Sequence, residues 1–133
     1  MAKNDKKAPD SKNQELINRI LANFDPNARM GEPILTQLKE LRQRFIEQEQ
    51  PTIVKSIRLA CEIIEKYGHF EIPYWNEEED GELTVPMFEY YLGLLSNPYN
   101  KYNRDEIKEI NIVLKENLSD EVEAADEPTG DNE

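Results

Sequence analysis

The sequence predicts an all-α protein, a compact bundle of about five helices with a short β-hairpin or an ordered loop between the third and the fourth. Two observations support this fold class. Five segments repeat large apolar residues every three or four positions, as one face of an α-helix requires. Breaks that contain proline, glycine or asparagine separate these segments. The chain has 133 residues, which is the length of one domain with a single hydrophobic core.

The first three helices are predicted at 12–24, 33–49 and 51–67. Ser11 and Gln14 have the spacing of a capping box before the first helix. Pro51 interrupts the second pattern and suits the first turn of the third helix, and Gly68 suits that helix's C-terminal cap. The predicted buried faces are Leu16, Ile17, Ile20, Leu21 and Phe24, then Ile34, Leu35, Leu38, Leu41 and Phe45, then Ile53, Ile57, Cys61 and Ile64.

The pattern changes after Gly68. Residues 70–74 and 82–85 alternate in polarity, and Asp80-Gly81 lies between them. Such alternation around an Asp-Gly pair indicates a β-hairpin, but Pro73 would restrict its strand to a sheet edge, and the connection is long. A hairpin and a structured loop therefore remain alternatives here.

The last two helices follow this segment. The fourth is predicted to begin near 84–86 and to end near Ser96, and the fifth is predicted to start at an Asn103 cap with Glu106 three residues later. Their predicted buried faces are Val85, Phe88, Tyr91, Leu92 and Leu95, then Ile107, Ile110, Val113, Leu114 and Leu118.

Charge divides the chain unevenly. Residues 1–12 and 119–133 lack an amphipathic repeat and are predicted to be disordered tails, the second of them acidic, on either side of one domain at 13–118. The formal net charge is −12, and residues 67–100 and 119–133 each carry seven acids and no Lys or Arg. This balance argues against direct binding to nucleic acid and to anionic lipid. No apolar run is long enough to span a membrane.

Motifs that carry chemistry are scarce. The chain has one Cys and one His, and it lacks a glycine-rich phosphate loop and a nucleophile elbow. We therefore predict no catalytic residue, metal site or cofactor. Residues 76–87 resemble a calcium loop, but Met87 stands where the bidentate glutamate belongs. The lone Cys61 fits the core of a protein in a reducing compartment, so the expected location is cytoplasmic.

Aromatic residues give the clearest functional hypothesis. Nine of the 11 Phe, Trp and Tyr residues lie between 67 and 102, and eight of these nine lie in the window 67–100, which has no Lys or Arg. Tyr and Trp are frequent at interface hot spots, and neighbouring carboxylates favour a cationic partner. The alternative is a small aromatic core beneath a long loop. The candidate partner-binding residues are Phe70, Tyr74, Trp75, Glu77, Glu78, Glu79, Asp80, Tyr99 and Tyr102.

The sequence therefore predicts a small, acidic, non-enzymatic protein-interaction module that docks a basic protein or peptide. One alternative is an acidic inhibitor, similar in role to an antitoxin or immunity protein, which masks a nucleic-acid-binding enzyme with residues 119–133. Another is a small-ligand or metal-binding protein. An apolar face left uncovered by five short helices could equally close a homodimer.

Overall fold

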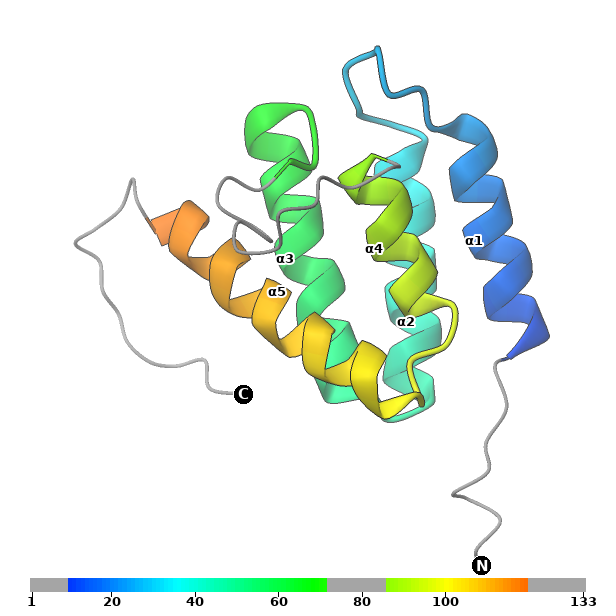
Figure 1. Ribbon diagram of the computed structural model, residues 1–133. Helices are drawn as coiled ribbons and strands as arrows, with labels where there is room; N and C mark the ends of the chain where they lie inside the picture. The colour runs from blue at the N-terminus through cyan, green and yellow to red at the C-terminus, as the bar shows by residue number, and fades with distance from the viewer. Residues whose placement is uncertain (1–9, 72–85, 120–133) are drawn as a thin grey trace, which may run out of the picture.

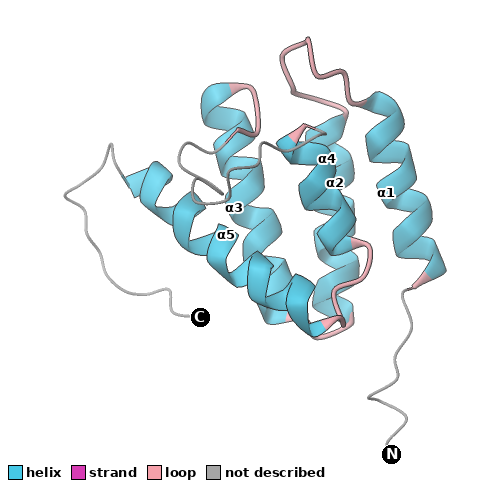
Figure 2. Cartoon of the chain, in the orientation of Figure 1, coloured by secondary structure: helices cyan, strands magenta, loops and turns pink. Residues whose placement is uncertain are grey.

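The computed structural model describes residues 10–71 and 86–119, which form five α-helices and their connections (Figure 1). The helices are α1 (Ser11–Asn23), α2 (Ile34–Glu47), α3 (Pro51–Tyr67), α4 (Met87–Leu95) and α5 (Lys101–Ser119). Figure 2 shows helices and loops, and no strand, in the described part of the chain. The all-α prediction is confirmed. Residues 72–85, which hold most of the segment predicted as a hairpin or loop, lie outside the described residues.

The central helix of the domain is α3, which packs against α2 on one side and α5 on another (Figure 1). A short turn at 48–50 joins α2 to α3, and Glu49 takes a left-handed conformation there, with φ 58°. This tight turn lets the two helices pack as an antiparallel pair. Helix α1 covers α2, and α4 packs on α5. The domain is thus a row of helices with α4 closing one side.

The core is made by the apolar faces that the sequence predicts. The described residues of those faces are buried except Leu21, Phe24, Val113 and Leu118, which are partly buried and pack against the core. The ring of Phe88 lies 5.1 Å from that of Phe24 and 5.6 Å from that of Phe70, between centroids. Ser56 and the fully buried Tyr91 share a 2.8 Å hydrogen bond between their hydroxyl groups. A compact aromatic cluster therefore joins α4 to the end of α3.

Two of the helix starts differ from prediction by one residue and by three. Asp10, not Ser11, caps α1: its carboxylate accepts hydrogen bonds from the backbone N–H groups of Lys12 and Asn13. Residues 10–12, predicted as tail, therefore belong to the domain. Asn100, not Asn103, accepts from the first turn of α5. In both cases the helix begins earlier than predicted, and an earlier side chain accepts from the free N–H groups of its first turn. The predicted C-cap is confirmed, since Gly68 ends α3 at φ 80°.

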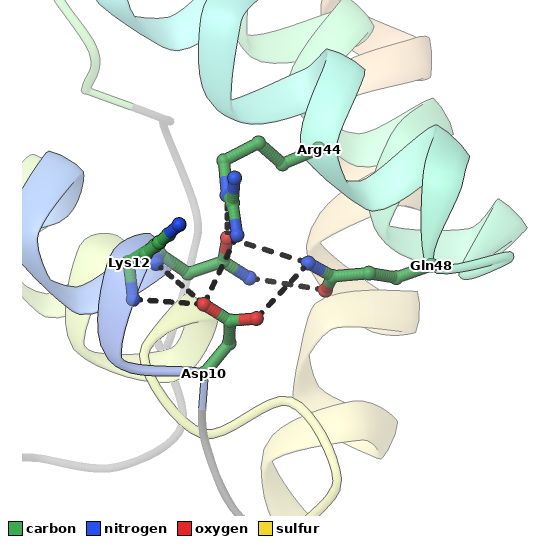
Figure 3. Close-up of polar contacts among 5 residues, drawn as sticks. Asp10, Lys12, Arg44 and Gln48 are labelled. Carbon is green, nitrogen blue, oxygen red and sulfur yellow. Dashed lines mark hydrogen bonds and ion pairs between the residues drawn. The ribbon is translucent and has the colours of Figure 1, made fainter.

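The Asp10 carboxylate also ties α1 to the end of α2 (Figure 3). Its Oδ1 lies 3.1 Å from Nη2 of Arg44, and its Oδ2 accepts from Nε2 of Gln48 at 3.4 Å. Asn13 donates to Gln48 over 3.1 Å and accepts from Arg44. The pKa of Asp10 is lowered, chiefly by the backbone N–H of Asn13, with further lowering by Lys12 N–H and Arg44 that outweighs partial burial. Both charge and hydrogen bonding therefore stabilise this helix start.

We predict that Asp10→Ala lowers the free energy of unfolding at pH 7 by about 1 kcal/mol, the usual effect of losing an N-cap. Asp10→Asn retains capping ability and loses only the charge. Because the folded pKa is lowered, the charge stabilises the domain above the unfolded pKa of about 3.9, and this contribution is lost as the pH falls through the folded value. In urea unfolding, the free energy of unfolding of wild type should exceed that of Asp10→Asn at pH 7. In strong acid the two free energies should be equal. A pH-independent difference would contradict this assignment.

Candidate functional site

The structure describes three of the predicted partner-binding residues, and they differ in exposure. Phe70 is 2% exposed and its ring lies 4.8 Å from that of Tyr91, so it belongs to the aromatic core. Its prediction as a contact residue is corrected on that ground, because a buried ring cannot reach a partner of the folded domain. Tyr99 is partly buried, and Tyr102 is 79% exposed. The remaining candidates, Tyr74, Trp75, Glu77, Glu78, Glu79 and Asp80, lie outside the described residues.

The predicted surface combined residues near 70–82 with residues 97–102. Of the first part, the structure describes Phe70 and Glu71, which line a small hollow of about 50 Å³ together with Pro86 and Met87 at the start of α4. Tyr99 and Tyr102 follow the other end of α4, whose nine residues span about 13 Å. Among the described residues, Phe70 and the two tyrosines therefore lie towards opposite ends of α4.

Tyr99 instead lies near the start of α1. Its pKa is raised, first by burial and then by the negative charge of Asp10, while Arg104 opposes the shift. A tyrosine in this position packs the α4–α5 connection against the domain. Tyr102 is the strongly exposed aromatic residue of this pair.

A different surface emerges at the start of α3. One hollow of about 440 Å³ lies between the second half of α2 and the first two turns of α3. Ile46 and Val54 supply apolar atoms, and Arg42, Lys55 and Arg58 supply positive charge. Its lining residues are Arg42, Ile46, Glu49, Gln50, Pro51, Val54, Lys55 and Arg58.

A second hollow of about 610 Å³ lies on the other side of the same turn of α3, against α5. Its lining residues are Pro51, Thr52, Lys55, Lys108, Asn111, Ile112 and Lys115. Both hollows include Pro51 and Lys55. The two hollows adjoin at these residues and are lined by α2, α3 and α5, and we call them together the basic groove.

The basic groove combines exposed apolar groups with cations. Ile46 and Ile112 are 42% and 58% exposed, so their apolar side chains are accessible to a ligand. Five cationic residues and one acidic residue, Glu49, line the groove. This composition suits an anionic ligand that also carries apolar groups.

The cations of the groove differ in their existing contacts. Arg58 forms an ion pair with Glu62 at 3.1 Å, and Arg42 donates to the backbone carbonyl of Val54 at 3.1 Å. Within the described ranges, Lys55 and Lys108 form no ion pair. These two ammonium groups are therefore the ones most available to a ligand.

Asn111 occupies the floor of the groove. Its side chain is 7% exposed, and Nδ2 donates to the carbonyl of Thr52 at 3.4 Å. Its Oδ1 is the buried side-chain polar atom without a partner among residues 10–71 and 86–119. No side chain caps the first turn of α3 beside it, so the backbone N–H groups there remain available to an acceptor.

The sequence interpretation missed the basic groove because it summed charge along the chain. Residues 13–66 and 101–118 each sum to zero, although five of their cations line the groove in the folded domain. A helical-wheel comparison would have shown part of the signal. Lys108, Ile112 and Lys115 follow a four- and three-residue spacing on α5, and Arg42 and Ile46 are four apart on α2.

The residues best suited to nucleophilic chemistry lie apart. Burial raises the pKa of the Cys61 thiol to about 11, and its side chain lies in the core. His69 is exposed and stacks on Tyr67 with 5.9 Å between ring centroids. The thiol is therefore protonated at neutral pH and packs as a small apolar group.

Comparisons with protein-family models, with curated proteins and with solved structures find no match to this chain. In the described ranges, no group of three or more His, Cys, Asp and Glu side chains could hold a metal ion. No helix in those ranges is long and apolar enough to cross a bilayer.

We predict that Cys61 reacts with a thiol reagent such as Ellman's reagent only when the domain opens. In the native protein at pH 8, labelling should be at least about a hundredfold slower than in urea, because the thiol is both protonated and buried. Rapid stoichiometric labelling of native protein would contradict the placement of Cys61 in the core.

Proposed function

We propose that this chain is a non-enzymatic protein-interaction module whose basic groove binds an acidic, partly apolar segment of a protein partner. The observation that carries the proposal is that the two hollows adjoin at Pro51 and Lys55. The exposed Ile46 and Ile112 therefore line neighbouring hollows that five cations also line. An extended or helical peptide that alternates acidic and apolar residues satisfies both features at once.

The composition of the groove favours a peptide over nucleic acid. Its apolar groups come from three helices, and isoleucine side chains contribute to peptide binding by losing contact with water. Nucleic acid would also have to approach a chain whose formal net charge is −12, against long-range repulsion. An acidic peptide carries fewer charges and meets the groove only at short range.

The affinity should be modest and dependent on salt. Exposed ion pairs contribute about 0.2–1 kcal/mol each, and the charges at the rim lie within reach of screening ions, whose Debye length is about 8 Å at physiological ionic strength. We therefore expect weak binding at physiological ionic strength that weakens further as salt is added. Such a module would exchange partners readily, and the cytoplasm is its expected location.

A second docking function uses the acidic, aromatic side of the chain. The observation that favours it is Tyr102, 79% exposed next to a window, residues 67–100, that has seven acids and no Lys or Arg. In this proposal Tyr74, Trp75 and the acids at 77–80 contact a basic protein. The two functions are compatible, since they use opposite charges and different residues.

To test the basic groove, a photo-crosslinking amino acid is placed at Ile112 and, as a matched control, at the exposed Arg19 of α1. We expect protein crosslinks formed in the native cell at position 112 to map to peptides rich in Asp and Glu, and to disappear when Lys55 and Lys108 are both changed to Glu. Mass spectrometry identifies the crosslinked peptides.

The control for charge is a second double variant, Lys12→Glu with Arg19→Glu, which changes the net charge equally on α1, across the domain from α5 (Figure 1). Crosslinks should persist in this variant. Equal crosslinking from position 19, basic crosslinked peptides, or crosslinks to nucleic acid would each contradict the proposal.

For the acidic and aromatic side, we expect Tyr74→Ala with Trp75→Ala, and separately neutralisation of 77–80 to Gln or Asn, to weaken capture of basic partners at least about tenfold, as loss of a hot spot does. Quantitative affinity capture measures the binding of each variant, and thermal unfolding of the same variants checks that they remain folded. Retention of every partner by stably folded variants would refute this second function.

A further inference from the structure

We propose that residues 120–133 of the same chain occupy the basic groove and thereby compete with acidic partners. These residues carry seven acids and no base, and Val122, Ala124 and Ala125 lie among the acids. They therefore combine negative charge with small apolar side chains, the same combination that the groove complements. The docking itself is a property of this chain alone, whereas its regulatory consequence rests on the proposed function.

Connectivity places this segment at the edge of the groove. Helix α5 ends at Ser119, one turn after Lys115, which lines the groove. From Ser119 back to Lys108 the helix axis runs about 16 Å. Fourteen extended residues reach about 46 Å, so residues 120–133 can turn back along α5 and reach both Lys108 and Lys55.

The available contacts agree with this path. Lys55 and Lys108 form no ion pair within the described ranges. The first turn of α3, which lacks a side-chain cap, presents backbone N–H groups at the same place, and a carboxylate near a helix N-terminus is favourable. Ile112 is 58% exposed between Lys108 and Lys115, where a small side chain such as Val122 can cover it.

Tethering makes even weak contacts effective. A segment joined to the domain by a short stretch of chain has an effective concentration at the groove on the order of millimolar. A segment that binds with a sub-millimolar dissociation constant would then occupy the groove for most of the time. A partner must displace it, so its apparent affinity falls by the fraction of chains whose groove is open.

The other acidic segment of the chain is a poorer occupant. Its flanking residues Glu71 and Pro86 line one hollow near the end of α3. The groove lies at the beginning of that helix, whose 17 residues span about 25 Å. Residues 72–85 are joined to the domain at both ends, near the end of α3 that lies away from the groove. Residues 120–133 are joined at one end only, so they can extend further towards the groove.

The direct test is paramagnetic broadening in the full chain. Thr129→Cys carries a nitroxide spin label, while the buried Cys61 stays unmodified, and amide signals are followed by NMR. We expect broadening at Thr52, Lys55 and Ile112 and little at Arg19. The broadening should be lost in Lys55→Glu/Lys108→Glu and retained in Lys12→Glu/Arg19→Glu. No broadening in the groove, or equal broadening at Arg19, would overturn the proposal.

Mixing identifies which chain supplies the segment. Chains that carry the spin label but no ¹⁵N are mixed with ¹⁵N-enriched chains that carry no spin label. We expect no broadening in the enriched chains at low concentration, because the segment binds its own groove. Broadening at Thr52 and Ile112 in the mixture would overturn self-occupancy in favour of exchange between two copies.

A probe peptide separates this inference from the proposed function. The probe is a fluorescein-labelled octapeptide of alternating Glu and Val, measured by anisotropy. A full-chain variant in which Glu121, Glu123, Asp126 and Glu127 become Gln or Asn should bind it at least about threefold more tightly than wild type. If wild type and the variant bind the probe equally and the spin label causes no broadening in the groove, the proposal that residues 120–133 occupy the groove is overturned, while the function proposed for the groove stands. No binding to either overturns the function proposed for the groove.

Discussion

The burial of α3 between α2 and α5 is the packing interaction on which the rest of this structure depends. Its residues Ile53, Ile57 and Ile64 are almost completely inaccessible to solvent. Removing one such side chain to Ala typically costs about 2–5 kcal/mol, a large part of the total stability of a domain this size. Because α3 is fixed on two sides, its ends are fixed as well. Gly68 directs the chain towards Phe70 at one end, and Pro51 starts the groove at the other.

The functional surface follows from the same packing. Helices α2 and α5 cover two sides of α3 but leave the side of Val54, Lys55 and Arg58 partly open near its first turns. Residues at that opening come from three helices, so the groove exists only in the assembled domain. One side of the groove is formed by α5, which ends at Ser119, and the acidic residues 120–133 follow it in the sequence. The positively charged groove can therefore bind either the attached acidic segment or an acidic partner. Salt and the concentration of the partner shift the balance between the two.

Local patterns in the sequence predict most of the fold. The apolar spacing identifies all five helices, and Pro51 and Gly68 mark both ends of α3, because those signals depend on a few neighbouring residues. The caps at Asp10 and Asn100 were predicted at later residues, since several polar side chains precede each helix and only the backbone geometry selects among them. The prediction for Phe70 failed for another reason. Its neighbours suggest an exposed edge, and only long-range packing against Phe88 and Tyr91 makes it a core residue. The groove escaped prediction because its cations come from separate helices that are each nearly neutral.

The central claim is that the charge of the groove selects its ligand, and a charge-swap cycle tests this most directly. Binding of two octapeptides, alternating Glu-Val and alternating Lys-Val, is measured for wild type and for Lys55→Glu/Lys108→Glu, with Lys12→Glu/Arg19→Glu as the matched control. The account predicts that wild type and the control prefer the acidic peptide, and that only the groove variant exchanges this preference for the basic one. An unchanged preference in the groove variant, or the same exchange in the control, would contradict it.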